Sequence, residues 1–325
     1  MMKKEDLRIV FMGTPEFAVE TLKALVENDY NVVAVVTQPD KPVGRHQNEL
    51  QPSEVKKYAL EHGLPVLQPE KMKDPAFVET LRSYQANLQV VVAFRMLPEV
   101  VWAMPEYGTF NVHAALLPQY RGAAPINWAV INGEAQTGVT TFFLDHDIDT
   151  GRIIMQKPFT IPDDADVEYV YDGLMHLGAE ICLETLERIV AADGYPESIP
   201  QEQLLATTDE LHHAPKIFKE TCEINWNKPA KCIYDFVRGL SPYPGAWTTI
   251  VAPDGKETVL KIFKTSRTNL KDGETGTTAI IDKHPCIWTG DELLRIDELQ
   301  MAGKKRMAGR DFLNGIKKFD SYIIK

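Results

Sequence analysis

Cysteine is scarce in this sequence of 325 residues, and long apolar runs are absent. The four cysteines lie far apart, at Cys182, Cys222, Cys232 and Cys286. No two of them form a Cys-x-x-Cys pair, so we expect neither a disulfide framework nor a zinc site, and a reducing cytoplasm fits. No stretch approaches the ~18–20 apolar residues of a membrane span, and the charged start lacks the long apolar region of a signal peptide. We therefore expect a cytoplasmic protein with no membrane association.

The glycine and glutamate of a calcium loop are also missing. Asp145, Asp147 and Asp149 alternate as they do at the start of an EF-hand. Thr150 stands where that loop requires glycine, and its twelfth residue is Gln156 instead of glutamate. This pattern excludes an EF-hand calcium site, and we expect no metal.

The Gly-x-Gly-x-x-Gly spacing of dinucleotide-binding enzymes is absent as well, which makes an oxidoreductase the weakest interpretation. Only Gly13, Thr14 and Pro15 follow the first apolar run. We expect Thr14 to cap the next helix and Pro15 to be its first residue. Because this loop leaves the carboxyl end of a strand, where open α/β sheets bind ligands, all three are candidate substrate-binding residues.

Positive charge is low overall, with 35 Lys and Arg, 46 Asp and Glu and a net charge of −11. Residues 1–213 carry a net charge of −16, and residues 214–325 carry +5. Such asymmetry indicates a polyanion-binding module, although the surface charge of two domains can also differ for no functional reason. The candidate phosphate contacts are Lys304, Lys305, Arg306 and Arg310. The alternative is that these residues form only a solvated loop.

Strand and helix signals alternate in the first half of the chain. The expected strands are residues 7–12, 31–37, 64–67, 88–94, 109–113, 137–144 and 153–160, and the expected helices are 15–27, 54–62, 74–84, 125–132 and 167–191. Most of these strands are continuously apolar, which is typical of a parallel sheet covered on both faces. We therefore expect a doubly wound, mainly parallel, Rossmann-like α/β domain over residues 1–192.

The pattern changes after the long helix. Residues 193–213 lack periodicity and are expected to form a linker. One helix at 228–240 and six short strands with Gly and Asp turns follow, at residues 223–226, 247–251, 259–265, 277–281, 286–288 and 293–300. This arrangement predicts a small OB-like β-barrel domain over residues 214–325.

The residues with the clearest chemistry are Asn111, His113 and Asp149. Asn111 and His113 lie two apart at the end of a strand, so their side chains leave on the same face. A strand end, a turn and a helix start follow, which together form a pocket wall. These three groups suit acyl transfer. The amide can donate to a carbonyl oxygen, the imidazole can move protons, and the carboxylate can set the charge of the imidazole. The alternative is a buried, hydrogen-bonded structural pair.

Several segments, including those that contain Asn111, His113 and Asp149, resemble a known protein family. The sequence resembles the folate-dependent formyltransferases at residues 13–18, 36–40, 110–113, 116–118, 121–126 and 149–151, and at 241–247 it resembles the second domain of the two-domain members. The match extends over essentially the whole chain. It implies direct transfer of a formyl group from 10-formyltetrahydrofolate to an amine, with Asn111, His113 and Asp149 as the catalytic residues. Asn111 would donate to the formyl oxygen, His113 would supply a second donor or a proton, and Asp149 would support His113 and accept the proton of the amine.

The resemblance also implies where the folate binds. The cofactor turn falls on Ala115, Leu116, Leu117 and Pro118. Ala115 replaces the usual serine, which removes one hydroxyl group but leaves the backbone groups and the leucine side chains.

The acceptor implied by the resemblance is initiator methionyl-tRNA, with no obligate protein partner. The family's tRNA-contacting loop falls on residues 39–51, a long polar segment. Arg45 occupies the position of a basic contact in that loop, but Gln47 and Asn48 replace the usual lysine pair. The basic residues after 213 would follow the tRNA backbone.

Two further interpretations stay open at this point. The acceptor could be an amino-sugar nucleotide, glycinamide ribonucleotide or another small amine. The chain could also be a nucleic-acid binder without activity, although the intact set of Asn111, His113 and Asp149 argues against that. Formylation assays would separate the acceptors, and folate binding would separate an enzyme from a binder.

Overall fold

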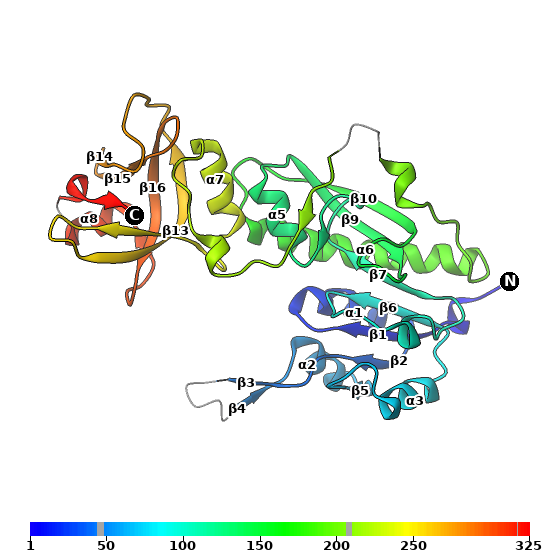
Figure 1. Ribbon diagram of the computed structural model, residues 1–325. Coiled ribbons are helices and arrows are strands. Elements are labelled where there is room, and N and C mark those ends of the chain that lie inside the picture. Colours follow the sequence, from blue (N-terminus) through cyan, green and yellow to red (C-terminus); the bar gives the residue numbers. More distant parts are fainter. Residues whose placement is uncertain (44–48, 206–209, 317) are drawn as a thin grey trace. The chain divides into compact units, whose positions relative to one another are not determined.

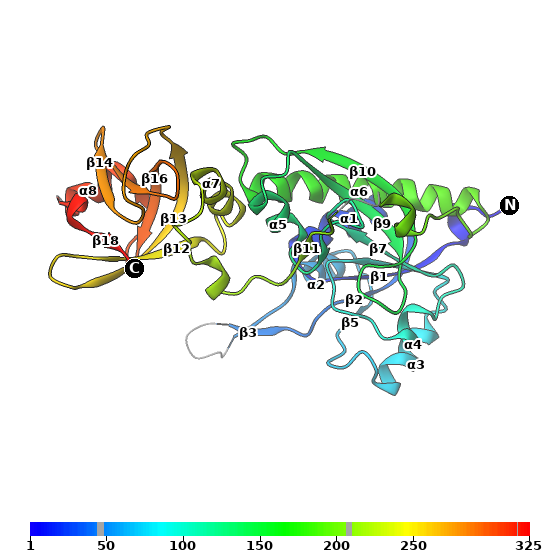
Figure 2. The same cartoon turned by 45° about the horizontal axis from the view of Figure 1, so that its top comes forward.

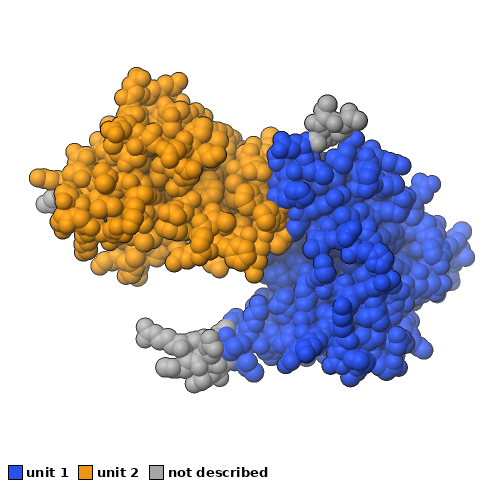
Figure 3. Space-filling view, viewed as in Figure 1, with its two compact units in different colours: residues 1–122, 137–160, 171–213 blue, residues 123–136, 161–170, 214–325 orange. Residues whose placement is uncertain are grey.

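The computed structural model of the chain describes residues 1–43, 49–205, 210–316 and 318–325 (Figures 1 and 2). The chain divides into two compact units, which are coloured separately in Figure 3. Unit 1 comprises residues 1–122, 137–160 and 171–213, and unit 2 comprises residues 123–136, 161–170 and 214–325. Each unit is described by itself below.

Unit 1 is built on one mixed sheet with the strand order β10-β9-β7-β6-β1-β2-β5 (Figure 1). Its strands are β1 (Arg8–Gly13), β2 (Asn31–Val36), β5 (Val66–Leu67), β6 (Leu88–Val92), β7 (Thr109–His113), β9 (Gln136–Phe143) and β10 (Ile153–Thr160). The strands from β7 to β5 pair in parallel, whereas β9 runs antiparallel to β7. Every residue of β6 is buried, as a strand covered on both faces requires. The predicted doubly wound, mainly parallel sheet is confirmed.

The described α-helices of this fold are α1 (Glu16–Glu27), α2 (Glu54–Glu61), α3 (Pro75–Ser83), α4 (Glu99–Trp102) and α6 (Val167–Ala191). Four of these five agree closely with predicted segments, whereas α4 was not predicted. None of the helices in the described ranges is both long and apolar enough to cross a membrane.

The start of α1 differs from the prediction. Pro15 is the N-cap, in an extended conformation, and its side chain cannot cap. Thr14 therefore lies outside the helix, and its hydroxyl oxygen accepts from the Thr37 hydroxyl at 3.5 Å. The expected capping role of Thr14 and the helical position of Pro15 were wrong, because the proline ring sits one residue before the first helical turn.

The polar segment after β2 is not simply a loop. Its described parts form the antiparallel pair β3 (Lys41–Val43) and β4 (Glu49–Gln51). At its base, Asp40 accepts from Lys56 Nζ and Gln68 Nε2, each at 2.7 Å. These hydrogen bonds lower the pKa of the Asp40 carboxyl group, which stays ionised and anchors the segment.

The main part of unit 2 is an antiparallel sheet with the strand order β14-β15-β16-β13-β12-β18 (Figure 2). Its strands are β12 (Ala246–Val251), β13 (Glu257–Arg267), β14 (Thr278–Ile281), β15 (His284–Trp288), β16 (Leu293–Met301), β17 (Met307–Ala308) and β18 (Ile323–Ile324). A bridge between Thr277 and Ile323 joins the two edges of this sheet, so it closes as the predicted small barrel. The predicted strand 223–226 was wrong, because only Glu223 pairs there, with Trp247.

The described part of unit 2 also contains the α-helices α5 (Pro125–Ile131), α7 (Ala230–Gly239) and α8 (Gly309–Gly315). Helices α5 and α7 approach closely, and the Asn127 amide donates to the carbonyl oxygen of Gly239 at 2.9 Å. A Cβ atom on Gly239 would lie 2.6 Å from a carbon of Ile131, so this crossing requires glycine. Their packing explains why residues 123–136 belong to unit 2.

Candidate active site

Strand β7 brings Asn111 and His113 to the carboxyl end of the unit 1 sheet. Asn111 pairs with Val91 on one side and Phe142 on the other. Its side-chain oxygen is buried and has no hydrogen-bond partner within the described ranges. Rotation of the amide by about 180° exchanges its oxygen and nitrogen, so the same place can present a donor. An unpartnered buried amide normally costs free energy, which points to a bound group that satisfies it.

His113 is buried, with 6% of its surface exposed. Its Nε2 lies 2.9 Å from the carbonyl oxygen of Tyr120, and its Nδ1 lies 3.8 Å from Asp149 Oδ2. A carbonyl oxygen only accepts, so Nε2 carries a hydrogen and donates it. The second nitrogen faces the carboxylate beyond hydrogen-bond distance, which leaves Nδ1 as the atom able to exchange a proton.

Asp149 is held in an unusual backbone conformation, with φ at 56°. Its Oδ2 accepts from the backbone N–H of Gly122 at 2.9 Å, which aims the carboxylate toward His113. Two residues later, a Cβ atom on Gly151 would lie 1.7 Å from the Phe143 carbonyl oxygen, so only glycine fits. This Asp-Thr-Gly turn thus fixes the carboxylate between the strand ends.

A residue that sequence reasoning missed supports this turn. Gln201 is fully buried, and its amide nitrogen donates to the carbonyl oxygens of Asp149 at 2.9 Å and Gly151 at 2.8 Å. Its amide oxygen accepts from Arg121 at 3.1 and 2.6 Å. Gln201 lies in the segment expected to be a linker, about fifty residues after the turn, and no periodicity marks it.

The turn Ala115–Pro118 is pinned by a second missed residue. The Thr140 hydroxyl group donates to the carbonyl oxygen of Ala115 at 2.6 Å and accepts from the backbone N–H of Leu117 at 3.0 Å. Gln156 Nε2 donates to the Leu117 carbonyl oxygen at 2.7 Å. Thr140 faces His113 across the β7–β9 pair, so only the register of the strands could have revealed it.

The side chains of this turn differ in accessibility. Ala115, Leu117 and Pro118 are buried, and Leu116 is partly exposed. A Cβ atom on Gly138 would lie 2.5 Å from a carbon of Leu116, so the glycine makes room for that side chain. Leu116 and the backbone groups are therefore the parts of the turn that a ligand can reach.

The remaining candidates lie elsewhere. Gly13 ends β1, and a Cβ atom there would lie 2.6 Å from Ala18 of α1. Close packing against α1 therefore explains why this position is a glycine. Thr14 and Pro15 follow it, separated from β7 by strand β6 in the sheet order. Arg45, with Gln47 and Asn48, lies outside the described residues.

Comparisons with known proteins place this geometry in a family. Residues 7–186 match the family described as Formyl transferase, and residues 216–317 match the Formyl transferase C-terminal domain. The methionyl-tRNA formyltransferase of Parabacteroides distasonis is 59% identical to this chain, covering 99% of this chain and 100% of its own length. The methionyl-tRNA formyltransferase of Bacteroides fragilis is 54% identical, covering 100% of this chain and 99% of its own length.

Solved structures show the same fold at low identity. HypX from Aquifex aeolicus in complex with tetrahydrofolic acid has a TM-score of 0.61 at 20% identity, covering 96% of this chain and 48% of that one. The sugar 3N-formyl transferase WlaRD has a TM-score of 0.63 at 18% identity, covering 92% of this chain and 99% of that one. From the family matches and the close relatives, the chain belongs to the formyl transferase family and, within it, to the methionyl-tRNA formyltransferases.

Proposed function

We propose that this enzyme transfers the formyl group of 10-formyltetrahydrofolate to the free amino group of initiator methionyl-tRNA, giving N-formylmethionyl-tRNA for translation initiation. The full-length relatives named for this reaction support the acceptor. The observation that carries the chemistry is His113 held beside Asp149, with the unpartnered side-chain oxygen of Asn111 two residues earlier on the same strand. An amino-sugar acceptor has only a fold likeness at 18–19% identity in its favour.

In the proposed reaction, the methionyl amine attacks the formyl carbon while negative charge gathers on the formyl oxygen. Asn111 donates a hydrogen bond to that oxygen, which is typically worth ~3–4 kcal/mol in the transition state. His113 supplies a proton or a second donor from Nδ1, since Nε2 is committed to Tyr120. Asp149 stabilises the charged imidazole and accepts the proton that the amine loses. The bond between the formyl carbon and N10 of the folate then breaks, N10 takes up the proton that the amine lost, and tetrahydrofolate leaves. No covalent bond to the protein forms.

The residues present fit a folate as second substrate. The folate supplies the activated formyl group, and we propose that the turn of Ala115, Leu116, Leu117 and Pro118 holds its ring system. The side-chain oxygen of Asn111 has no partner in the described residues and lies on the strand that leads into this turn, which suits a polar group of the ligand. The scheme uses only groups of the protein and of the two substrates.

We also propose which segments of the chain carry out catalysis and tRNA binding. We assign catalysis to residues 1–192, the connection to residues 193–213 and tRNA binding to residues 214–325, in a cytoplasmic enzyme that needs no protein partner. The net charges of −16 before residue 214 and +5 from there on support that assignment. We keep Gly13, Thr14, Pro15 and Arg45 as proposed substrate contacts.

The acceptor is tested by supplying 10-formyltetrahydrofolate with charged initiator tRNA, an amino-sugar nucleotide or glycinamide ribonucleotide in parallel. We expect formylation of the tRNA alone. Efficient formylation of either small amine, with none on the tRNA, would overturn the proposed acceptor.

The folate turn gives a paired prediction. Thr140→Val removes the hydroxyl group that pins Ala115 and Leu117, so we expect it to destabilise the fold by ~1–3 kcal/mol and to weaken tetrahydrofolate binding. Thr141→Val is the control, because its equally buried hydroxyl group contacts Thr185 and not the turn. Urea unfolding and calorimetric titration with tetrahydrofolate measure both effects. Equal folate affinity in the two variants would show that Thr140 does not contribute to folate binding.

The basic cluster after Gly303 gives a second prediction. All three basic residues are exposed, but Arg306 is paired with Glu298 and lies over the Phe263 ring, whereas Lys304 and Lys305 form no ion pair within the described residues. Neutralising both lysines should flatten the slope of log K for tRNA against log salt by roughly 2, about one per lost phosphate contact. Filter binding across a salt series measures the slope, and an unchanged slope would show that these lysines do not face the tRNA.

A further inference from the structure

The side chain of Gln201 is fully buried against the turn that carries Asp149. Its amide nitrogen donates to the carbonyl oxygens of Asp149 at 2.9 Å and Gly151 at 2.8 Å. Its amide oxygen accepts from Arg121 Nε at 3.1 Å and Nη2 at 2.6 Å. These four bonds use both hydrogens of the amide and both lone pairs of its oxygen. Gln201 can therefore influence a reaction only through the groups that it holds.

Arg121 determines which way the Gln201 amide points. A guanidinium group only donates hydrogen bonds, and carbonyl oxygens only accept them. Rotation of the amide by about 180° would place its nitrogen against the guanidinium and its oxygen against the two carbonyl oxygens, so all four bonds would be lost. Since buried polar groups without partners are costly, the amide has one stable orientation.

The position of Gln201 is fixed by paired backbone. Ile199 and Ile153 exchange two backbone hydrogen bonds of 2.8 Å, which form an antiparallel bridge at the start of β10. Gln201 follows two residues later, although the whole of α6 separates it from β10 in the sequence. The bridge therefore carries the glutamine to the turn that precedes β10.

The turn needs such support because Asp149 has a left-handed backbone, with φ at 56°. Residues with a side chain seldom adopt this conformation unless their surroundings enforce it. Gln201 holds the carbonyl oxygen of Asp149, and the N–H of Gly122 holds its Oδ2 at 2.9 Å. Backbone and side chain of one residue are thus fixed from two sides, with the carboxylate 3.8 Å from His113 Nδ1.

The segment 120–122 connects Gln201 to the imidazole. Its first carbonyl oxygen accepts from His113 Nε2 at 2.9 Å, its arginine donates to Gln201 Oε1, and its last N–H donates to Asp149 Oδ2. The imidazole, the carboxylate and the buried amide therefore share one short piece of backbone. Gln201 belongs to the frame that sets the distance between the two reacting groups.

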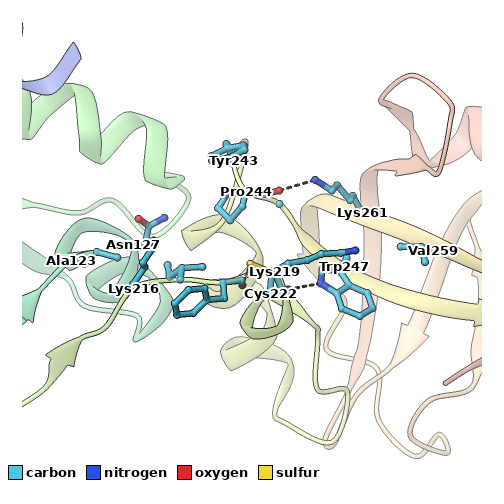
Figure 4. A pocket seen from close by; sticks show the side chains of 14 residues that line it. Ala123, Asn127, Lys216, Lys219, Cys222, Tyr243, Pro244, Trp247, Val259 and Lys261 are labelled. Atoms are coloured by element: carbon cyan, nitrogen blue, oxygen red, sulfur yellow. Dashed lines mark hydrogen bonds between the residues drawn. The ribbon is translucent and has the colours of Figure 1, made fainter. Parts of the chain in front are cut away.

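Side-chain bonds to the backbone elsewhere have a simpler form. Beside a cavity of about 520 Å³ in unit 2, Trp247 Nε1 donates to the carbonyl oxygen of Lys219 at 2.8 Å (Figure 4). At the same cavity, Lys261 Nζ donates to the carbonyl oxygen of Pro244 at 2.9 Å. Each of these bonds ties one side chain to one carbonyl oxygen. Gln201 instead joins two carbonyl oxygens of one turn and is itself oriented by a cation.

We propose that Gln201, oriented by Arg121, is a positioning residue for formyl transfer that keeps the Asp149 carboxylate at His113. This inference rests on the proposed function and adds to it a residue that touches neither substrate. It gives the segment 193–213 a part in catalysis besides connecting two domains. A purely structural role would change only the free energy of unfolding, whereas a positioning role lowers kcat in the folded enzyme.

Steady-state formylation of charged initiator tRNA by the full chain tests this role. Gln201→Ala removes both donors, and we expect kcat to fall by about 10–100-fold, because misplacing a reacting group by ~1 Å can cost about 10²-fold. KM for the folate and for the tRNA should stay unchanged. Gln201→Glu keeps the size of the side chain and its bonds with Arg121, but an ionised carboxylate cannot donate to the carbonyl oxygens. It should lose kcat as well, which keeps the test usable if the alanine variant does not fold.

The sharpest measurement repeats Gln201→Ala in an Asp149→Asn background. There it should lower kcat by less than about twofold, because the carboxylate that Gln201 positions is already absent. The matched control is Gln89→Ala. Gln89 is also buried, at 1% exposure, and its Oε1 accepts from the Thr109 hydroxyl at 2.9 Å on the same sheet. Its loss should lower the free energy of urea unfolding and leave kcat unchanged.

Folded Gln201 variants with wild-type kcat, or with a raised KM alone, would overturn the inference. Equal losses of kcat in the wild-type and Asp149→Asn backgrounds would also overturn it, because Gln201 would then act independently of Asp149. The same holds if Gln89→Ala lowers kcat as much as Gln201→Ala does. A wild-type enzyme that formylates no tRNA would instead contradict the proposed function.

Discussion

Replacing His113 with alanine is expected to lower kcat for formyl transfer by ~10²-fold or more, because a positioned acid–base group contributes at least that much. The ring is buried between the Tyr120 carbonyl oxygen and the Asp149 carboxylate, so its loss removes the proton-carrying atom from the strand end. KM for methionyl-tRNA should change little, since in the proposed reaction the ring contacts the reacting atoms and not the tRNA body. Steady-state formylation with charged initiator tRNA measures both constants.

The matched control for this variant is His176→Ala. That ring also lies beside a carboxylate, with Nδ1 3.6 Å from Oε1 of Glu20 on α1, but the ring is exposed on α6 and takes no part in the proposed site. We expect wild-type turnover from it. Near-normal turnover of His113→Ala would exclude His113 from the mechanism.

Replacing Asn111 with alanine is expected to lower kcat by ~10²–10³-fold, the usual cost of losing one donor to a developing oxyanion. Folate and tRNA affinities should stay close to those of the wild type if the amide acts mainly in the transition state. Single-turnover transfer at saturating substrates isolates this effect.

A suitable control is Asn87→Ala, at the amino-terminal end of the neighbouring strand β6. The Asn87 side chain accepts from the Arg8 N–H and donates to the Asp6 carbonyl oxygen, so its loss destabilises the fold. It lies before β6, whereas Asn111 lies toward the end of β7, so kcat should be unaffected. A loss of stability without a loss of kcat in Asn111→Ala would make that residue structural.

Much of the fold could be predicted from local pattern. The strand at residues 109–113 has the same bounds in the structure, because its apolar residues are flanked by a turn on each side. Period-2 alternation along it placed Asn111 and His113 on one face. The bounds of α6 were also correct, since a long amphipathic pattern is the most reliable local signal.

The missed features depend on contacts between distant residues. Gln201 bonds the carbonyl oxygens of Asp149 and Gly151, and nothing in its own segment distinguishes it from a linker residue. Thr140 is one of several threonines in β9, and only the pairing register brings its hydroxyl group to the turn at Ala115. Such positions are determined by tertiary packing, which a single sequence does not reveal.

Single-turnover transfer from 10-formyltetrahydrofolate with a labelled formyl group tests the account most directly. The enzyme is mixed with charged initiator methionyl-tRNA, and both the tRNA and the protein are assayed for label over time. We predict that the label appears only in N-formylmethionyl-tRNA, at a rate that Asn111→Ala and His113→Ala each lower by ~10²-fold or more. Label bound covalently to the protein before it reaches the tRNA, or no formylmethionine at all, would contradict direct transfer at this site.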